Sequence, residues 1–534
     1  MKAKAVMVLG TASGVGKSVI AAGLCRLFSD WGYRTAPFKA QNMSNNSFVT
    51  EEGGEMGRAQ VVQAECARVC PHTDMNPILL KPAADHSSKV VVQGKAIGHF
   101  TARDYYDPAL REKMVKAVRE SYERLASEYE ILVLEGAGSP AEVNLKENDF
   151  VNIKMAQWAD AVCLLVVDID RGGVFASLVG TLDLLSPEER ARIGGLIINK
   201  FRGDKSLLTT GLDFLEERTG KKIWGVVPFD AGLRIEEEDA ATIETASAAS
   251  LPLKDGTVPA EPAKDAVIAN PARRAKPSFS SILDIAVILF PRISNFTDFD
   301  ALRHEPSVRL RYVRQSAELG RPDLLILPGT KATVADLRFL EESGLSEGIL
   351  KFAGEGGRVL GICGGYQMLG EAIEDPDQIE MAGTGRMRGL GLLRIRTEFK
   401  PEKILRQVST ELDLVLFGDR VRGRVTGYEI HMGRTFLHEP YASFGEGGAI
   451  HPSGRVAGTY FHGLFDSGLF RQSFLNALRR SLGKETSQHT AVFHNSRPLS
   501  ELKEMHYVRL AKLLSENLNL DLLRECLNLP LPSY

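Results

Sequence analysis

The sequence predicts an α/β protein with two open, mostly parallel sheets, the first of them doubly wound with helices on both faces. Between about residues 5 and 228, short β-branched runs alternate with longer helical stretches, a pattern typical of a parallel sheet covered by helices. The same alternation resumes at residue 284, after a stretch of different composition. We therefore expect two α/β domains on one chain.

Four segments are expected along the chain. The first domain is predicted over 1–240, with strands at 5–9, 35–38, 131–134, 162–167, 196–198 and 223–227. Residues 241–281, rich in Ala, Pro, Ser, Thr and Lys, bury too little to fold alone and are predicted to be a linker. The second domain is predicted over 282–481, with strands at 284–289, 308–313, 324–327 and 359–362. A tail over 482–534 has apolar residues at helical spacing and is predicted to be helical.

The composition is that of a globular protein without a general affinity for polyanions. Of 534 residues, 44% are hydrophobic and 25% are charged, which excludes a largely disordered chain. A net charge of −3 gives no reason to expect nucleic acid or an anionic membrane as the partner. The longest apolar stretches, 161–167 and 285–290, are far below the roughly 20 residues of a membrane span, and the N-terminus lacks a signal-peptide pattern. We expect a cytoplasmic protein, whose oligomeric state the sequence leaves open.

The first predicted strand runs into a glycine-rich loop, Gly10-Thr11-Ala12-Ser13-Gly14-Val15-Gly16-Lys17-Ser18, and then into a helix. The backbone N–H groups of such a loop, at Thr11, Gly14 and Gly16, can close around phosphates at a helix N-terminus. Lys17 neutralises phosphate charge, and Ser18 can ligate Mg²⁺. A plain strand-to-helix turn is the alternative interpretation.

Two further strands of the first domain end in polar residues. The strand at 131–134 is followed by Glu135, a position where a carboxylate can bind Mg²⁺ or its water beside the phosphates. An acidic cap of the next helix is the alternative. The strand at 196–198 is followed by Asn199, whose amide suits hydrogen bonding to a purine, although a simple turn asparagine fits the spacing as well.

These residues resemble a known family. The offset loop, the Glu135-Gly136-Ala137-Gly138 strand end and Asn199 are similar to the dethiobiotin synthetase type of P-loop ligase. The resemblance implies a P-loop domain that uses ATP, with Mg²⁺, to phosphorylate a carboxylate or carbamate. The strict Walker pattern has glycine where Thr11 stands, and this departure is part of the resemblance.

The second domain carries a predicted nucleophile. The strand at 359–362 is followed by Cys363-Gly364-Gly365, a tight turn that exposes a thiol at the start of a helix. In Gly458-Thr459-Tyr460-Phe461-His462-Gly463, His462 is placed at a strand end as the base for Cys363 in acyl-thioester chemistry. The turn at Gly329, together with Gly364, offers backbone N–H groups for an oxyanion hole. A buried structural cysteine and a structural histidine are the alternatives.

These segments resemble the class I glutamine amidotransferases of the triad type, which implies a flavodoxin-like α/β domain. The familiar triad has a glutamate two residues after the histidine, but Leu464 stands there, so only the Cys363–His462 dyad is predicted. His431 is an alternative base, with Glu429 as an orienting residue.

The segments 38–47, 74–82 and 292–300 resemble the cobyric acid synthase family. The resemblance implies amidation of the b, d, e and g carboxylates of adenosylcobyrinic acid a,c-diamide, with ATP forming an acyl phosphate and glutamine supplying ammonia. Lys39, Asn42 and Lys81 are predicted to bind the corrinoid's carboxylate or amide groups. Simple loops are the alternative for these segments.

Two rival functions are compatible with the same motifs. Cobyrinic acid a,c-diamide synthase shares both domain types, although the segments 74–82 and 292–300 favour the cobyric enzyme. The other rival is a P-loop ATPase switch with an amide-sensing, glutaminase-like domain. The presence of both Cys363 and His462 argues against the switch.

Overall fold

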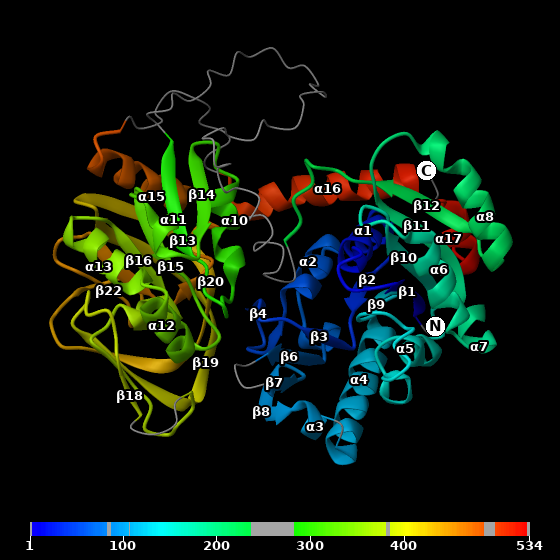
Figure 1. Cartoon of the computed structure of the whole chain (residues 1–534), viewed down its shortest axis with the longest axis horizontal. Coiled ribbons are helices and arrows are strands. Elements are labelled where there is room, and N and C mark those ends of the chain that lie inside the picture. The colour runs from blue at the N-terminus through cyan, green and yellow to red at the C-terminus, as the bar shows by residue number, and fades with distance from the viewer. Residues whose placement is uncertain are drawn as a thin grey trace, which may run out of the picture. The chain divides into compact units, whose positions relative to one another are not determined.

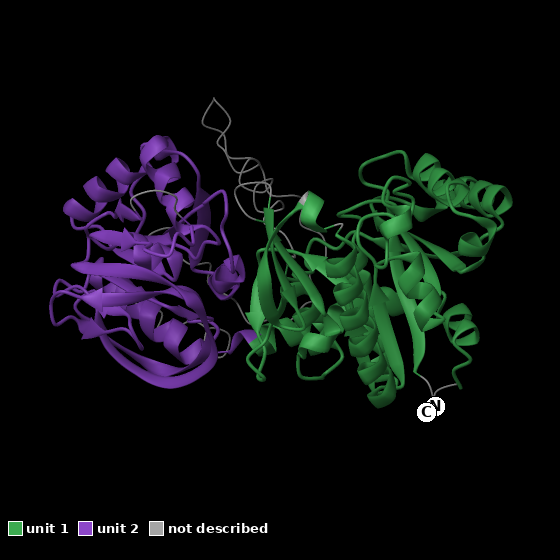
Figure 2. Cartoon of the chain, turned by 90° about the horizontal axis from the view of Figure 1, so that it is seen from below, with its two compact units in different colours: residues 1–238, 500–534 green, residues 239–499 purple. Residues whose placement is uncertain are grey.

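The computed structural model describes residues 3–82, 87–105, 107–236, 282–380, 385–484 and 497–530. The chain divides into two compact units, coloured separately in Figure 2: unit 1 is Met1–Glu238 with Ser500–Tyr534, and unit 2 is Asp239–Leu499. Each unit contains an open α/β sheet (Figure 1), so the predicted fold class is confirmed. The linker predicted over 241–281 lies outside the described residues.

The main sheet of unit 1 is parallel throughout, with the strand order β12-β11-β10-β1-β9-β2. Every strand predicted for the first domain is present: β1 (Lys4–Gly10), β2 (Thr35–Phe38), β9 (Ile131–Glu135), β10 (Val162–Asp168), β11 (Ile193–Phe201) and β12 (Ile223–Pro228). Because these strands run in one direction, their carboxyl ends share one edge. The glycine-rich loop, Glu135 and Asn199 therefore lie at the same edge of the sheet.

Helices cover both faces of this sheet, because alternate residues of a strand point to opposite sides. Met7 and Leu9 of β1 share a core with α4, α5 and α6, whereas Val6 and Val8 pack with α1 and the C-terminal helices. The helices before the tail are α1 (Lys17–Asp30), α2 (Arg58–Cys66), α3 (Ala102–Tyr105), α4 (Pro108–Glu128), α5 (Ile153–Ala159), α6 (Val174–Asp183), α7 (Pro187–Ala191) and α8 (Thr209–Thr219).

Between β2 and β9 the chain forms short strands that the sequence analysis did not predict. One small sheet has the order β3-β6-β7-β8, and β4 pairs with β5. Buried charged residues such as Lys81 and Lys89 interrupt the apolar pattern by which strands are recognised. The strands are β3 (Gln41–Met43), β4 (Ser47–Val49), β5 (Glu55–Gly57), β6 (Ile78–Pro82), β7 (Ser87–Val92) and β8 (Lys95–Thr101).

The main sheet of unit 2 has the order β14-β13-β15-β16-β23-β22-β21, and only β22 and β21 are antiparallel to their neighbours. The strands are β13 (Leu283–Ile288), β14 (Val308–Val313), β15 (Leu324–Leu327), β16 (Val359–Ile362), β21 (Ala442–Ser443), β22 (Ala449–Ile450) and β23 (Val456–Thr459). The helices are α10 (Asp300–Arg303), α11 (Ser316–Leu319), α12 (Thr333–Glu342), α13 (Leu345–Gly354), α14 (Gly364–Met368) and α15 (Gly468–Ser481), with a 3₁₀ helix, η5 (Phe296–Phe299).

A second sheet of unit 2, with the order β18-β17-β19-β20-β24, contains a long hairpin. Its strands are β17 (Ala372–Glu374), β18 (Arg386–Arg388), β19 (Ile395–Leu416), β20 (Asp419–Leu437) and β24 (Phe461–His462). Tyr428 of β20 pairs with His462 of β24. The hairpin therefore lies against the strand that carries the predicted base.

The described part of the C-terminal tail is helical, with α16 (Leu499–Asn517) and α17 (Leu520–Cys526). Tyr507, Leu510 and Leu514 share a core with α1, and Leu518 bridges to Gly225 of β12. The tail from Ser500 onward thus belongs to unit 1, although the chain passes through unit 2 to reach it. Within the described residues, no helix has the length and apolarity needed to cross a bilayer.

Candidate active sites

The glycine-rich loop of unit 1 closes over the carboxyl end of β1. Gly14 and Gly16 have φ of +73° and +99°, backbone conformations that side-chain-bearing residues rarely adopt. Lys17 Nζ donates to the carbonyl of Ala12 at 2.9 Å and to that of Gly138, beyond β9, at 3.0 Å. Lys17 therefore links the loop to the segment after Glu135.

Asn199 supports this loop from β11. Its Nδ2 donates to the carbonyl of Val15 at 2.9 Å, and a Cβ on Gly16 would lie 2.2 Å from the same nitrogen. The loop is anchored on its other side by Thr11, whose N–H donates to the carbonyl of Val166 at 3.0 Å. Asn199 is thus in contact with the loop, while its role toward a purine stays a prediction.

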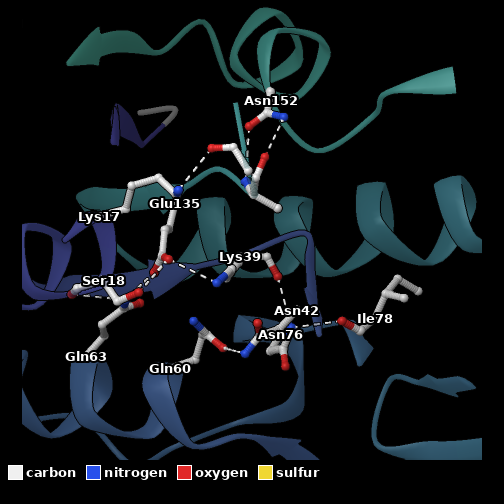
Figure 3. Close-up of polar contacts among 12 residues, drawn as sticks. Lys17, Ser18, Lys39, Asn42, Gln60, Gln63, Asn76, Ile78, Glu135 and Asn152 are labelled. Carbon is white, nitrogen blue, oxygen red and sulfur yellow. Dashed lines mark hydrogen bonds and ion pairs between the residues drawn. The ribbon is translucent and has the colours of Figure 1, made fainter. Parts of the chain in front are cut away.

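Glu135 is the centre of a buried polar network (Figure 3). Its Oε1 accepts from Ser18 Oγ at 2.7 Å and from Lys39 Nζ at 3.0 Å, and its Oε2 accepts from Gln63 Nε2 at 2.6 Å. Burial acts to raise the pKa of Glu135, but the Lys39 ammonium and the three hydrogen bonds hold that pKa below its usual value. Glu135 is therefore an anion, next to the hydroxyl predicted to bind the same metal.

Gln63 was not singled out from the sequence. Its Oε1 is buried and has no hydrogen-bond partner among the described residues. Nothing in the pattern of α2 marks this glutamine, since it simply occupies a buried position of the helix.

The predicted substrate residues fall into two places. Lys39 belongs to the Glu135 network, and Asn42 Nδ2 donates to Gln60 Oε1 at 2.9 Å nearby (Figure 3). Lys81 instead forms a separate buried ion pair with Glu55 and donates to Ser47 Oγ at 2.9 Å. The structure therefore brings Lys39 close to the predicted phosphoryl-transfer site and gives Lys81 a carboxylate partner within the chain.

In unit 2, Cys363 stands in a strained turn between β16 and α14. Its φ of 52° and ψ of −112° are rare for a residue with a side chain, as expected for a nucleophile elbow. A Cβ on Gly365 would lie 2.0 Å from the carbonyl oxygen of Leu327, so only glycine allows the turn to approach β15 this closely. The thiol is 3.4 Å from the carbonyl of Ile430 on β20.

His462 has a carboxylate partner that the sequence analysis missed. Its Nδ1 lies 2.7 Å from Asp298 Oδ2, and Asp298 Oδ1 accepts the backbone N–H of Gly463 at 3.0 Å. Burial opposes a charge on the ring, but Asp298 and the nearby Cys363 together raise the pKa of His462 to about 10. Asp298 lies in the segment 292–300, which the sequence analysis treats only as an indicator of the substrate.

His431, the alternative base, lies in a different environment. Its Nδ1 is 2.8 Å from the carbonyl of Gly433, and its ring stacks on Tyr460 at 3.7 Å. Burial lowers its pKa to about 4, so the ring is neutral at pH 7. Glu429, suggested as an orienting residue, binds Arg406 at 2.6 Å. Between the two histidines, His462 is the one with a carboxylate on its ring nitrogen.

The two predicted oxyanion-hole glycines lie on adjoining segments. A Cβ on Gly364 would lie 3.3 Å from the backbone nitrogen of Thr330, and one on Gly329 would lie 3.2 Å from His462 Cε1. Gly365 N–H donates to the carbonyl of Pro328 at 3.0 Å, which holds the elbow against this loop. The geometry is compatible with the predicted role, which stays a prediction.

Comparisons with known proteins agree with this two-site architecture. Residues 6–243 match the model of the CobQ/CobB/MinD/ParA nucleotide binding domain, and residues 284–470 match that of the CobB/CobQ-like glutamine amidotransferase domain. The cobyric acid synthase of Pelotomaculum thermopropionicum is 46% identical, with 99% of this chain and 98% of the relative covered. That of Listeria welshimeri is 44% identical, covering 97% and 96%, and that of Sorangium cellulosum is 47% identical, covering 90% and 92%.

The chain belongs to the cobyric acid synthase family. It is therefore an ATP-dependent glutamine amidotransferase of cobalamin biosynthesis, and the predicted family and enzyme class are confirmed. The nucleotide-binding match covers the glycine-rich loop, Glu135 and Asn199, and the amidotransferase match covers Cys363 and His462. The similarity to the cobyric acid synthase of Pelotomaculum thermopropionicum extends over 99% of this chain, so it includes the tail, which neither domain match reaches.

Proposed function

We propose that this enzyme amidates the b, d, e and g carboxylates of adenosylcobyrinic acid a,c-diamide to give adenosylcobyric acid. Each amide consumes one ATP and one glutamine. The observation that supports this most strongly is the similarity to cobyric acid synthases along nearly the whole chain.

The synthetase site of unit 1 activates the carboxylate. A corrinoid carboxylate attacks the γ-phosphate of ATP to form an acyl phosphate, and ammonia then displaces phosphate to leave the amide. Lys17 and the loop N–H groups stabilise the negative charge on the transferred phosphoryl group. Lys39, an ammonium beside Glu135, binds the carboxylate that is to be activated.

The residues around Glu135 fit a Mg²⁺ ion. Ser18 Oγ and the Glu135 carboxylate are adjacent, and Gln63 adds a buried amide oxygen without a partner among the described residues. These are the hard oxygen ligands that Mg²⁺ prefers. The bound ion would neutralise charge on the phosphate oxygens, and Ser18, Glu135 and Gln63 would hold it.

The glutaminase site of unit 2 supplies the ammonia. The Cys363 thiol gives its proton to His462 Nε2, and the thiolate attacks the side-chain amide carbon of glutamine. His462 returns the proton to the leaving nitrogen, so that ammonia departs and a thioester remains. Water, deprotonated by His462, then hydrolyses the thioester to glutamate and regenerates the thiol.

Mass spectrometry of corrinoid products tests the proposed substrate. The purified enzyme is incubated with ATP, Mg²⁺ and glutamine, and with either adenosylcobyrinic acid a,c-diamide or cobyrinic acid. We expect four amides to be added to the diamide and no a,c-amidation of cobyrinic acid. Conversion of cobyrinic acid to its a,c-diamide would instead identify the rival synthase. ATP hydrolysis without any amidated corrinoid or glutamate release would favour the ATPase switch.

A further inference from the structure

The segment before Asp298 connects two parts of the glutaminase site. Ser294 N–H donates to the carbonyl of Gly329 at 2.9 Å, and Ile293 forms a β-bridge with Thr330, on the loop predicted to form the oxyanion hole. The chain then turns at Asn295, with a φ of 53°, into η5, which carries Asp298. One short segment therefore contacts both the loop beside the nucleophile and the base.

Both carboxylate oxygens of Asp298 contact the chain at the end of β24, the strand that carries the base. Oδ2 lies 2.7 Å from the Nδ1 atom of His462, and Oδ1 accepts the N–H of Gly463 at 3.0 Å. The carboxylate is 4% exposed and His462 is fully buried, so water does not compete for this contact. A carboxylate at Nδ1 holds one proton on that nitrogen and stabilises the imidazolium that forms when Nε2 takes the proton of the Cys363 thiol.

The Nε2 atom of His462 is available for this purpose. It is buried and makes no hydrogen bond of ordinary geometry with any described residue, while Cys363 lies close enough to raise the pKa of the ring. One face of the His462 ring is covered by Tyr428. The two ring centroids are 5.2 Å apart, and the ring planes are within 16° of parallel. The ring is thus fixed by Asp298 at one nitrogen and by Tyr428 on its face, with the other nitrogen left for the thiol.

We propose that Asp298 is the positioning residue of His462 and replaces the glutamate that the class I triad places two residues after the histidine. Leu464 occupies that position and is buried. The acid thus comes from a segment 164 positions earlier in the chain. The inference rests on the proposed roles of Cys363 and His462.

Two other titratable groups near His462, Glu429 and His431, have partners of their own. Glu429 on β20 binds Arg406, and His431 on the same strand is neutral and bound to Gly433. Replacing Asp298 by asparagine therefore removes the charge that stabilises the imidazolium form of His462. The pKa of His462 should fall, and the Cys363 thiol should lose the proton acceptor that favours its thiolate.

The test uses the full chain with Asp298→Asn, and with Asp300→Asn as the matched control. Asp300 lies two residues further on and pairs with Arg303 at 3.6 Å. We expect Asp298→Asn to lower glutamine hydrolysis by on the order of 10²–10⁴-fold. Ammonia-dependent amidation and the melting temperature should stay near wild type. The rate of Cys363 carboxamidomethylation by iodoacetamide, followed by peptide mass spectrometry, should fall at pH 7 and recover at higher pH. Asp300→Asn should change none of these.

A double-mutant cycle shows whether Asp298 acts through the base. On a His462→Ala background, Asp298→Asn should cost almost nothing further in glutamine hydrolysis, because the group that it positions is gone. A full additional loss on that background, an unchanged alkylation profile, or a parallel loss of ammonia-dependent amidation would overturn the proposal. Cys363→Ala is measured alongside, and retained glutaminase activity in that variant would refute the site itself instead.

Discussion

At the scale of single residues, Glu135 of unit 1 is a buried carboxylate that stays ionised. It receives donors from α1, from the chain after β2 and from α2, and it stays ionised in the interior because Lys39 compensates its charge. Its place at the end of β9 explains only where Glu135 lies in the sheet. Its chemistry comes from the three side chains that the fold brings to it.

The first prediction concerns this carboxylate. Glu135→Gln keeps the size of the side chain but removes the charge that a hard cation prefers, so ammonia-dependent amidation should need much more Mg²⁺. Glutamine hydrolysis at Cys363 should persist. The measurement is a Mg²⁺ titration of ammonia-dependent amidation, together with Mg²⁺-dependent protection against thermal unfolding. Glu123→Gln, on the exposed side of α4, is the control. An unchanged half-saturation and maximal rate would show that Glu135 serves only the buried hydrogen-bond network and does not bind the metal.

A second residue-scale prediction follows from Glu236, which is buried between Arg58 at 2.7 Å and Lys503 at 3.0 Å. Burial opposes its charge, but the two cations lower the pKa of Glu236 to about 2. The interaction of the Glu236 carboxylate with these two cations contributes stability that is present above about pH 4.5, the usual pKa of a glutamate. This stability is lost as the pH falls toward 2. The contribution is on the order of 3 kcal/mol.

Urea unfolding at several pH values checks this predicted loss of stability on acidification. All three tryptophans, Trp31, Trp158 and Trp224, lie in unit 1, so their fluorescence reports on that unit. The stability difference between wild type and Glu236→Gln should be constant from pH 7 to about pH 5 and should shrink below pH 4.5. A difference that grows on acidification would contradict the assignment.

At the scale of elements, the helix α16 completes the core of unit 1. Leu514 is fully buried against α1, and a Cβ on Gly23 would lie 2.3 Å from its Cδ1. Arg26 of α1 also binds Glu504 of α16, with Nη2 and Oε1 at 2.6 Å. The C-terminal helices therefore join α1 in the core on one face of the sheet.

The third prediction is that Leu514→Ala lowers the free energy of unfolding of unit 1 by about 2–5 kcal/mol. Val508→Ala on the same helix should change it by less than about 0.5 kcal/mol, because Val508 is 50% exposed. Tryptophan fluorescence in urea measures both variants. Equal small effects would mean that α16 does not stabilise the sheet.

At the scale of the whole molecule, two chemistries are divided between two compact units. The nucleotide loop and Glu135 belong to unit 1, whereas Cys363, His462 and Asp298 belong to unit 2. Ammonia is the only chemical link that the proposed reaction requires between them. Substitutions in each unit should therefore have distinct effects on the two nitrogen sources.

The fourth prediction compares Cys363→Ala with Lys17→Ala. Cys363→Ala should abolish amidation driven by glutamine and spare amidation driven by high ammonia. Lys17→Ala should lower amidation from both sources by on the order of a hundred-fold or more, because both need the activated carboxylate. Cys70→Ala and Lys116→Ala, at exposed positions, are the controls. Ammonia-dependent activity retained in Lys17→Ala would refute the acyl-phosphate assignment.

The features that could be predicted from the sequence are local ones. Strands of both main sheets follow from runs of β-branched residues, and the loop at Gly14 and Gly16 and the elbow at Cys363 follow from glycines beside a reactive side chain. Such patterns predict a fold class and a nucleophile because neighbours along the chain produce them. The short strands after β2 left no such pattern, since buried lysines interrupt it.

Which distant residues meet depends on the tertiary structure. Asp298 reaches His462 across 164 positions, Gln63 reaches Glu135 across 72, and Glu504 reaches Arg26 across 478. A polar residue shows in the sequence that it needs a partner but not which partner, because the contact depends on how strands and helices pack in space. The base and its acid, and the sheet and the helix that covers it, are therefore set by packing rather than by spacing along the chain.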